Sequence, residues 1–323
     1  MPKFVITQAA DHVWMTEPVF FHCNVQTMET NTYQSPDPVD VGAVQVAAQA
    51  EFRAFRDRLV AAGITVTTVL GHPDSPDDIF PNWASTHVLE DGTRGIIYYP
   101  MLNENRRIER RPHLKSMLER SYRVILDMSD AERDNKAMEG TSAIWMDRIH
   151  KIAYSTLSAR ADRTLVQEWC AFMGYDLVGF ETRNHAGKPV YHTDVLMFVG
   201  TGYVGICLEC ILPEYRAAVR AKIESTGQEI IEITFDQLRE FCGNALELRA
   251  ADGSLKLVMS GSAYRAYRDD QKAAFLKYVS EIVYTDIPTI QTYGGGAARC
   301  MLMVCSASAI LVKSITERRL CVL

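Results

Sequence analysis

Apolar and polar positions along this chain follow one pattern that occurs five times. Each copy starts at a polar or glycine-rich turn, which we call a mouth. It continues as an apolar strand, a polar hairpin turn, a second strand, an amphipathic helix and a third strand. The mouths are marked by Asn82, Glu139, His192, Asn244 and Gly295. Their spacing of roughly 50 to 57 residues lies in the range in which repeats build propellers or solenoids.

Glycine and proline mark the boundaries inside these strand–strand–helix–strand units. Hairpin turns between apolar runs require positive φ, which glycine tolerates, and they are expected at Gly92, Gly202 and Gly253. Pro213 stands near the start of one helix. The glycines expected to end three helices are Gly63, Gly174 and Gly227. The apolar runs that follow the helices predict third strands over residues 64–69, 122–126, 175–180, 229–233 and 281–284.

A single unit of this kind cannot bury both faces of its sheet. Neighbouring units must therefore pack around a common axis, and five copies predict an α/β ring of sheets with helices outside and mouths at the centre. The first unit is split, and we expect residues 4–8 to complete a sheet with the other end of the chain. Residues 22–40 are polar and irregular, which predicts a long surface loop able to cover a central site.

Length and charge fit one large globular unit. With 323 residues, 47% of them hydrophobic, the chain can bury a large core, and the repeat predicts a single domain over residues 1–323. The net charge of −6 comes from interspersed signs, so neither a nucleic-acid nor a membrane partner is expected. No stretch reaches the roughly 18 apolar residues of a membrane span. The basic run from Arg106 to Arg111 is the nearest candidate for a charged binding surface, and the alternative is that it is a solvated helix face.

The eight cysteines show no regular disulfide framework, which predicts a reducing compartment and a cytoplasmic location. Cys207 and Cys210 form a lone C-x-x-C in an apolar strand without a second pair, and this argues against zinc or redox chemistry. We expect no metal or organic cofactor. The sequence leaves open whether the chain is a monomer or a homodimer.

The mouths carry residues suited to nucleophilic catalysis. Cys300 follows three glycines and two alanines, where little bulk would block a ligand from its sulfur, although a free cysteine is also commonly a small buried hydrophobe. His192 can exchange protons with a thiol nucleophile, and Glu139 or Asp194 can hold its tautomer. Alone, His192 could be structural and Glu139 a turn carboxylate. Their alignment with Cys300 by the repeat favours a catalytic set.

These residues resemble a known family. Residues 139–141 (Glu-Gly-Thr), residues 192–194 (His-Thr-Asp) and the glycine-rich loop before Cys300 look like the acid, H-x-D and cysteine motifs of the pentein, or amidinotransferase, superfamily. The resemblance covers nearly the whole chain and implies a five-bladed α/β propeller. It is closest to the citrulline hydrolase branch, through residues 78–83, 99–101, 105–107 and 190–193.

The resemblance also implies roles for individual residues. Cys300 would attack the central carbon of a guanidino or ureido group, and His192, oriented by Glu139, would protonate the leaving nitrogen and later activate water. Asp194 would hydrogen-bond the planar nitrogens of the substrate. The arginines matching the family's carboxylate-binding positions are Arg160, in a Ser-Ala-Arg turn, and Arg106, in the basic run.

One loop departs from the guanidine-processing relatives. They carry acidic residues where this chain has Asn82 and Trp83, whereas Asp77 matches. A guanidinium is cationic and favours anionic neighbours, but a ureido group is neutral and has a carbonyl oxygen that an amide N–H can satisfy. The departure favours a neutral substrate bound by Asn82, Trp83 and Asp77. Alternatively, Trp83 is packing and Asp77 or Asp78 supplies the missing charge.

The leading hypothesis is a cysteine hydrolase that converts citrulline to ornithine, ammonia and carbon dioxide through a covalent Cys300 intermediate. Within enzymes, an arginine deiminase, a dimethylarginine hydrolase or an amidinotransferase remain alternatives. A different class is a non-catalytic binding protein, because the same fold serves as a ribosome-associated factor. The thiol, imidazole and acid at corresponding mouths favour an enzyme with a small-molecule substrate.

Overall fold

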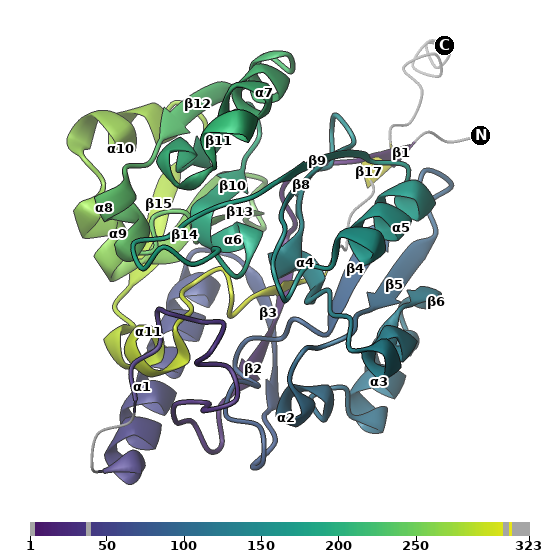
Figure 1. Ribbon diagram of the computed structural model, residues 1–323, viewed down its shortest axis with the longest axis vertical. Coiled ribbons are helices and arrows are strands. Elements are labelled where there is room, and N and C mark those ends of the chain that lie inside the picture. Colours follow the sequence, from purple (N-terminus) through teal and green to yellow (C-terminus); the bar gives the residue numbers. More distant parts are fainter. Residues whose placement is uncertain (1–3, 37–39, 306–309, 312–323) are drawn as a thin grey trace, which may run out of the picture.

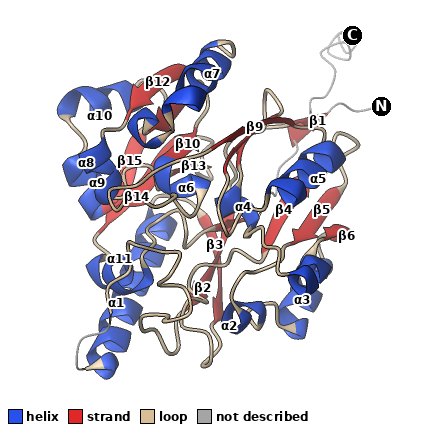
Figure 2. Ribbon diagram, in the orientation of Figure 1, coloured by secondary structure: helices blue, strands red, loops and turns tan. Residues whose placement is uncertain are grey.

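The computed structural model describes residues 4–36, 40–305 and 310–311. Five three-stranded sheets surround a common centre, and the crossover helices lie at the periphery (Figures 1 and 2). In each sheet the first two strands are antiparallel, and the third lies parallel to the second after a helical crossover. The predicted α/β ring of five strand–strand–helix–strand units is therefore confirmed.

Four of the sheets are continuous in sequence. Their elements are β4 (Ala84–Val88), β5 (Arg94–Tyr98), α2 (Glu104–Arg107), α3 (Pro112–Glu119) and β6 (Arg123–Asp127); β7 (Trp145–Asp147), β8 (Ile152–Thr156), α5 (Arg163–Met173) and β9 (Asp176–Phe180); β10 (Met197–Val199), β11 (Tyr203–Ile206), α7 (Pro213–Glu224) and β12 (Glu229–Glu232); β13 (Leu246–Arg249), β14 (Leu255–Ser260), α9 (Gly261–Ala266), α10 (Asp269–Phe275) and β15 (Glu281–Thr285). First strands of neighbouring sheets contact one another, as β7 does β10 and β10 does β13, so they surround the centre.

The fifth sheet joins the two ends of the chain, as predicted, but with residues 12–17 in place of residues 4–8. It consists of β16 (Met303–Val304), β2 (His12–Glu17) and β3 (Thr65–Leu70), with α1 (Val41–Ala61) as the crossover. Residues 4–8 do not complete this sheet. Instead β1 (Phe4–Val5) pairs with β17 (Ile310–Leu311) in a separate two-stranded ribbon. The ring takes residues 12–17 because Val13, Trp14 and Met15 are successive buried side chains, which a strand covered on both faces requires.

Helices and hairpins begin, end or turn at the residues that the sequence predicts. Helix α5 begins after Asp162, whose carboxylate accepts hydrogen bonds from the backbone N–H groups of Thr164 and Leu165, and ends at Gly174 with φ 68°. Pro213 is the first residue of α7. The hairpin glycines Gly92, Gly202 and Gly253 all have positive φ, as expected.

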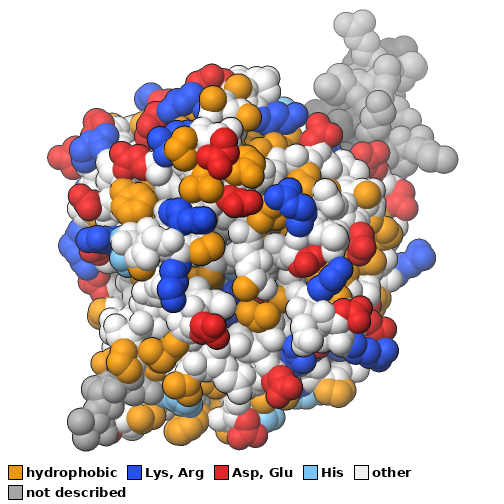
Figure 3. Space-filling model, viewed as in Figure 1, with side chains coloured by type: hydrophobic (Ala, Val, Ile, Leu, Met, Phe, Trp, Pro, Cys, Tyr) orange, Lys and Arg blue, Asp and Glu red, His pale blue; other side chains and the backbone are white. Residues whose placement is uncertain are grey.

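Short helical segments occupy the connections between sheets: η1 (Ser129–Asp134), α4 (Gly140–Ala143), α6 (Thr193–Leu196), α8 (Phe235–Arg239) and α11 (Pro288–Gly294). A further short segment, η2 (Leu208–Cys210), lies between β11 and α7. Among the described residues, no helix is both long enough and apolar enough to span a bilayer. On the face seen in Figure 3, Lys and Arg side chains are intermixed with Asp and Glu.

Candidate active site

Helix starts and loops at the centre of the ring bring the mouths together. Glu139 immediately precedes α4 and His192 immediately precedes α6, and these two helices contact each other. Gly140, with φ 48°, allows the first and second mouths to meet, because a Cβ there would lie 2.3 Å from the backbone oxygen of Asn82. Cys300 enters from the fifth mouth and reaches the same centre.

Residues of the first, third and fifth mouths line a cavity with about 250 Å³ of space between atoms, which includes open solvent. Its wall contains eight of the marked or neighbouring polar and reactive residues together with Phe80 and two glycines. The lining residues are Asn31, Asp77, Phe80, Asn82, Arg106, Arg160, Tyr191, His192, Gly294, Gly296 and Cys300. Of the nine residues singled out in the sequence, Glu139, Asp194 and Trp83 do not line the wall.

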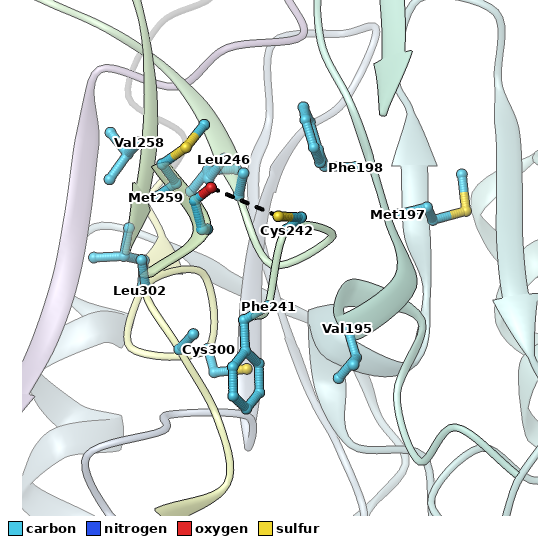
Figure 4. Packing of buried hydrophobic residues seen from close by; sticks show 14 of the residues in the cluster. Val195, Met197, Phe198, Phe241, Cys242, Leu246, Val258, Met259, Cys300 and Leu302 are labelled. Carbon is cyan, nitrogen blue, oxygen red and sulfur yellow. Dashed lines mark hydrogen bonds between the residues drawn. The ribbon is translucent and has the colours of Figure 1, made fainter. Parts of the chain in front are cut away.

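Cys300 is buried, with 3% of its surface exposed. It belongs to the main buried cluster, which also contains Val195, Phe241 and Leu302 (Figure 4). Its Sγ lies 3.6 Å from Asp194 Oδ2, to which it donates a hydrogen bond. Burial, followed by the neighbouring charge of Asp194, raises the pKa of Cys300 well above its ordinary value. The sulfur therefore rests as a thiol and needs a base or a stabilising group to become a nucleophile.

Glu139 and His192 form a directly hydrogen-bonded pair. His192 Nε2 lies 2.9 Å from Glu139 Oε2, and both side chains are buried. Burial opposes the charge of Glu139, but Arg160, the hydrogen bond from His192 and Arg106 together outweigh it and hold the pKa of Glu139 far below its ordinary value. Burial lowers the pKa of His192 in spite of that carboxylate. Nδ1 of His192 has no hydrogen-bond partner among the described residues and remains free for a proton transfer.

Asp194 lies beside Cys300, and Ser142 fixes its position. Ser142 Oγ is 2.8 Å from Asp194 Oδ2 and 2.8 Å from Asn82 Oδ1, so the hydroxyl connects the first and third mouths. Burial raises the pKa of Asp194. Its second oxygen, Oδ1, has no partner within the described part of the chain and could accept a substrate N–H. Ser142 was not identified from the sequence, although it follows the residue 139–141 motif directly.

The two arginines differ in how far they are already occupied. Arg106 donates to both carboxylate oxygens of Glu109, at 2.7 and 3.2 Å, and to the backbone oxygen of Phe80, and it lies 3.4 Å from Glu139. Its guanidinium is thus held by the protein itself. Glu109, the main partner, lies within the basic run from Arg106 to Arg111, for which the sequence left a solvated helix face as the alternative. That alternative for the basic run is wrong for Arg106, which is 1% exposed.

Arg160 is held mainly by groups that a ligand could replace. Its guanidinium donates to Thr30 Oγ1 at 2.8 Å and to the backbone oxygen of Thr27 at 3.2 Å, and it lies over the ring of Tyr191. Its remaining ionic partner is Glu139, at 3.4 Å. Of the two arginines, Arg160 is therefore the better placed to receive a substrate carboxylate.

Within the loop over residues 77–83, Asp77 lines the cavity, whereas Asp78 and Trp83 do not. Asp77 lines the cavity, accepts a hydrogen bond of 2.9 Å from Asn24, and has one oxygen without a described partner. Asp78 accepts a hydrogen bond from the backbone of His72 and lies 3.6 Å from Arg111, outside the cavity wall. The alternative in which Asp78 charges the cavity therefore has no support in this geometry.

Trp83 is fully buried in a hydrophobic cluster with Trp14 and Tyr98, and its ring stacks on that of Tyr98. The structure thus does not bring Trp83 to the cavity, and its packing alternative fits the observed position. The sequence could not separate the two uses of an aromatic residue at this point, because adjacent residues such as Asn82 and Trp83 point in different directions.

The polar loop that starts at residue 22 covers the cavity. Asn31 donates to the backbone oxygens of Gly294 and Gly295 at 3.3 and 3.2 Å, and Ser35 N donates to Thr292 at 2.8 Å. A Cβ at Gly295, where φ is 61°, would lie 2.5 Å from Gln34. These contacts hold the covering segment, residues 24–35, over the cavity that contains Cys300.

Metal-ligand geometry is missing from the described residues, in which no group of three or more His, Cys, Asp or Glu side chains could hold an ion. Cys207 and Cys210 are both buried, and Cys210 Sγ donates to the backbone oxygen of Cys207.

Comparison with solved structures reveals a shared fold at low identity. The N-terminal domain of ArgZ, an arginine dihydrolase from the ornithine–ammonia cycle in Cyanobacteria, bound to substrate, superposes with a TM-score of 0.70 at 14% identity, over 93% of this chain and 99% of that one. AgrE in complex with ornithine and NAD+ superposes with a TM-score of 0.69 at 15% identity, over 93% of this chain and 40% of AgrE. A dimethylarginine dimethylaminohydrolase adduct superposes with a TM-score of 0.61 at 15% identity, over 91% of this chain and 99% of that one. The chain spans 41% of the full-length ArgZ structure.

A comparison with curated proteins finds no match. The family model described as "N,N dimethylarginine dimethylhydrolase, eukaryotic" matches residues 17–306, which is most of the sequence. The match of this family model and the shared fold of five sheets confirm the predicted pentein propeller. The chain belongs to the N,N dimethylarginine dimethylhydrolase family of the pentein superfamily.

Proposed function

We propose that this hydrolase cleaves a linear C–N bond of a ureido amino acid, with citrulline as the substrate. The observation that supports this choice is Asn82, an uncharged amide in the cavity wall, together with Asp78 turned away toward Arg111. A neutral ureido group needs hydrogen-bond partners but no counter-charge, whereas a guanidinium favours carboxylates on several sides. In the wall itself Arg106 and Arg160 face a single carboxylate, Asp77.

The reaction consumes one water molecule. The Cys300 thiolate attacks the ureido carbon and forms a C–S bond, after which the bond from that carbon to the δ-nitrogen breaks. His192 gives a proton to the leaving nitrogen, and ornithine departs from a carbamoyl group bound to sulfur. His192 then accepts a proton from water as it attacks the carbamoyl carbon and breaks the C–S bond. The carbamate released decomposes to ammonia and carbon dioxide.

The remaining polar groups match the ends of an amino acid. Arg160 can exchange its hydrogen bonds with Thr30 and Thr27 for bonds to the α-carboxylate. Asp77, with one oxygen unpartnered, can accept from the α-ammonium group. Asp194 Oδ1 can accept from the ureido nitrogens near Cys300. Glu139 keeps His192 oriented and does not touch the substrate in this scheme.

A guanidino amino acid is the second candidate. Two carboxylate oxygens with no described partner, Oδ1 of Asp77 and of Asp194, would suit a cation, and fold neighbours include an arginine dihydrolase and a dimethylarginine dimethylaminohydrolase. An amidinotransferase would share the first step but pass its group to an amine instead of water. Family membership in a hydrolase family argues against the non-catalytic binding protein.

Product analysis by mass spectrometry separates the candidates. The reduced enzyme is incubated with citrulline, arginine or dimethylarginine, and ornithine with ammonia is expected from citrulline alone. Citrulline formed from arginine or dimethylarginine would mean a guanidine hydrolase instead. No turnover of any of the three would contradict both candidates.

The dependence of kcat/KM on pH is expected to be flat from below pH 6.5 to at least pH 9. Burial lowers the pKa of His192 from its ordinary 6.5 and raises that of Cys300 from its ordinary 9.0. A thiol with neutral imidazole carries as many protons as a thiolate with imidazolium, so the reactive pair is present between the two pKa values. Initial rates measured in overlapping buffers test this. An acidic limb centred above pH 7 would contradict it.

We further propose that residues 1–323 form one catalytic domain working in a reducing compartment such as the cytoplasm. The cysteines that carry free thiols include Cys170, Cys207, Cys210, Cys242, Cys300 and Cys305, which fits that environment.

A further inference from the structure

Asn244, at the fourth mouth, has no role in the scheme above, yet it touches the reacting atom. We propose that Asn244 is a further catalytic residue, whose side-chain amide donates a hydrogen bond to Cys300 Sγ and stabilises the thiolate form of the nucleophile. Asn244 Nδ2 lies 3.1 Å from Cys300 Sγ, and Asn244 is fully buried. The inference rests on Cys300 being the nucleophile of the proposed function, but not on which substrate it attacks.

The orientation of this amide is fixed by its other contacts. Asn244 Oδ1 accepts hydrogen bonds from two backbone N–H groups, those of Arg299 at 3.0 Å and Cys300 at 3.3 Å. Only the oxygen of an amide can accept from N–H donors, so the atom facing the sulfur must be the NH2 group. That group also donates to the backbone oxygen of Asp194 at 2.9 Å. The amide therefore ties the cysteine loop to the third mouth and points one donor at the sulfur.

This donor adds to a backbone hydrogen bond from Ala297, which also lowers the pKa of Cys300, in surroundings where burial and a carboxylate oppose a negative sulfur. Burial and the carboxylate of Asp194 both raise the pKa of Cys300. A hydrogen bond from Asn244 is stronger to a thiolate than to a thiol, so it acts in the opposite direction. The guanidinium of Arg299 also lowers the pKa of Cys300, but it is engaged with the backbone oxygens of Leu302 and Thr141. A neutral ureido substrate brings no positive charge of its own, so the groups that stabilise the Cys300 thiolate must come from the protein.

The test is the rate of Cys300 alkylation by iodoacetamide across the pH range, followed at the Cys300 peptide by mass spectrometry. Asn244→Asp keeps an oxygen for the two backbone N–H groups but replaces the donor with a second carboxylate oxygen. We expect the pH midpoint of alkylation to rise by about one to two units and kcat/KM to fall about 10- to 100-fold. Asn244→Ala should shift the midpoint in the same direction. Thermal unfolding shows whether each variant is folded.

Asn184→Asp is the matched control. Asn184 is also buried, its Oδ1 also accepts from two backbone N–H groups, and its Nδ2 donates to Thr32 instead of a sulfur. This variant should leave the alkylation midpoint unchanged. An unchanged midpoint in folded Asn244→Asp and Asn244→Ala, even with lost turnover, would overturn the inference. A shifted midpoint in an enzyme whose wild type does not turn over citrulline would support it and reject the proposed substrate.

Discussion

Replacing Cys300 by alanine is expected to lower turnover by at least about 10⁴-fold while the protein remains folded. The sulfur supplies the bond that carries the carbamoyl group, and neither His192 nor Asp194 can take over this step. Because alanine is smaller and apolar, it fits the buried position and removes only one sulfur from the cluster around Phe241. Steady-state rates together with thermal unfolding provide the measurement.

Cys305→Ala is a suitable control, because Cys305 is equally buried but lies in a different hydrophobic cluster. It should retain activity close to that of the wild type. Residual turnover of the Cys300 variant within tenfold of the wild type would show that the nucleophile is elsewhere. Global unfolding of Cys300→Ala would instead show that the residue is required for the core.

Replacing Glu139 by glutamine should reduce both activity and stability. The carboxylate orients His192 at 2.9 Å and is the only carboxylate partner of Arg160 among the described residues. An amide of the same shape leaves the buried guanidinium uncompensated, at a cost of about 3 kcal/mol in the free energy of unfolding. Loss of the correct imidazole orientation should lower kcat about 10²- to 10⁴-fold. Chemical denaturation and steady-state kinetics measure the two effects.

The stability difference should depend on pH in one direction. Because the pKa of Glu139 in the folded protein lies far below its ordinary 4.5, its contribution is fully present above about pH 4.5 and falls as the pH decreases toward the folded value. The wild type and Glu139→Gln should therefore converge in acid. Glu247→Gln is the control, because Glu247 is buried but accepts its hydrogen bonds from Thr201 and forms no ion pair among the described residues. Equal losses in the two variants would contradict a specific role for Glu139.

Local signals in the sequence were sufficient to predict most strands of the ring. The predicted third strand over residues 229–233 corresponds to β12 (Glu229–Glu232), and the other four agree similarly well. Glycine at a positive-φ position and alternating apolar residues depend on neighbours a few positions away, so they can be read directly. The closure of the ring by both ends of the chain was predicted, but its N-terminal strand was placed at residues 4–8, which contribute β1 to the ribbon with β17, instead of at β2. Two short apolar segments lie near the N-terminus, and local pattern does not decide which of them pairs with β16.

For the site, the repeat was sufficient to bring Glu139 and His192 into one set with Cys300, because equivalent positions of repeated units meet at one end of the ring. The structure places the Glu139 carboxylate and the His192 imidazole in direct contact. The repeat also marked Asn244, but not its contact with the sulfur, which depends on the direction of one amide. Ser142 was missed altogether, because a serine beside a motif has many uses.

The sequence by itself determined the fold class, the family resemblance and the residue types available at each mouth, since these follow from periodicity and short motifs. Only the tertiary structure decided how those side chains are used. It committed Arg106 to Glu109, directed Asp78 away from the cavity and packed Trp83 into the core. It also laid the covering segment over Arg160. The reason is physical: side-chain direction, burial and pairing depend on residues far away in the chain, and a one-dimensional pattern does not contain them.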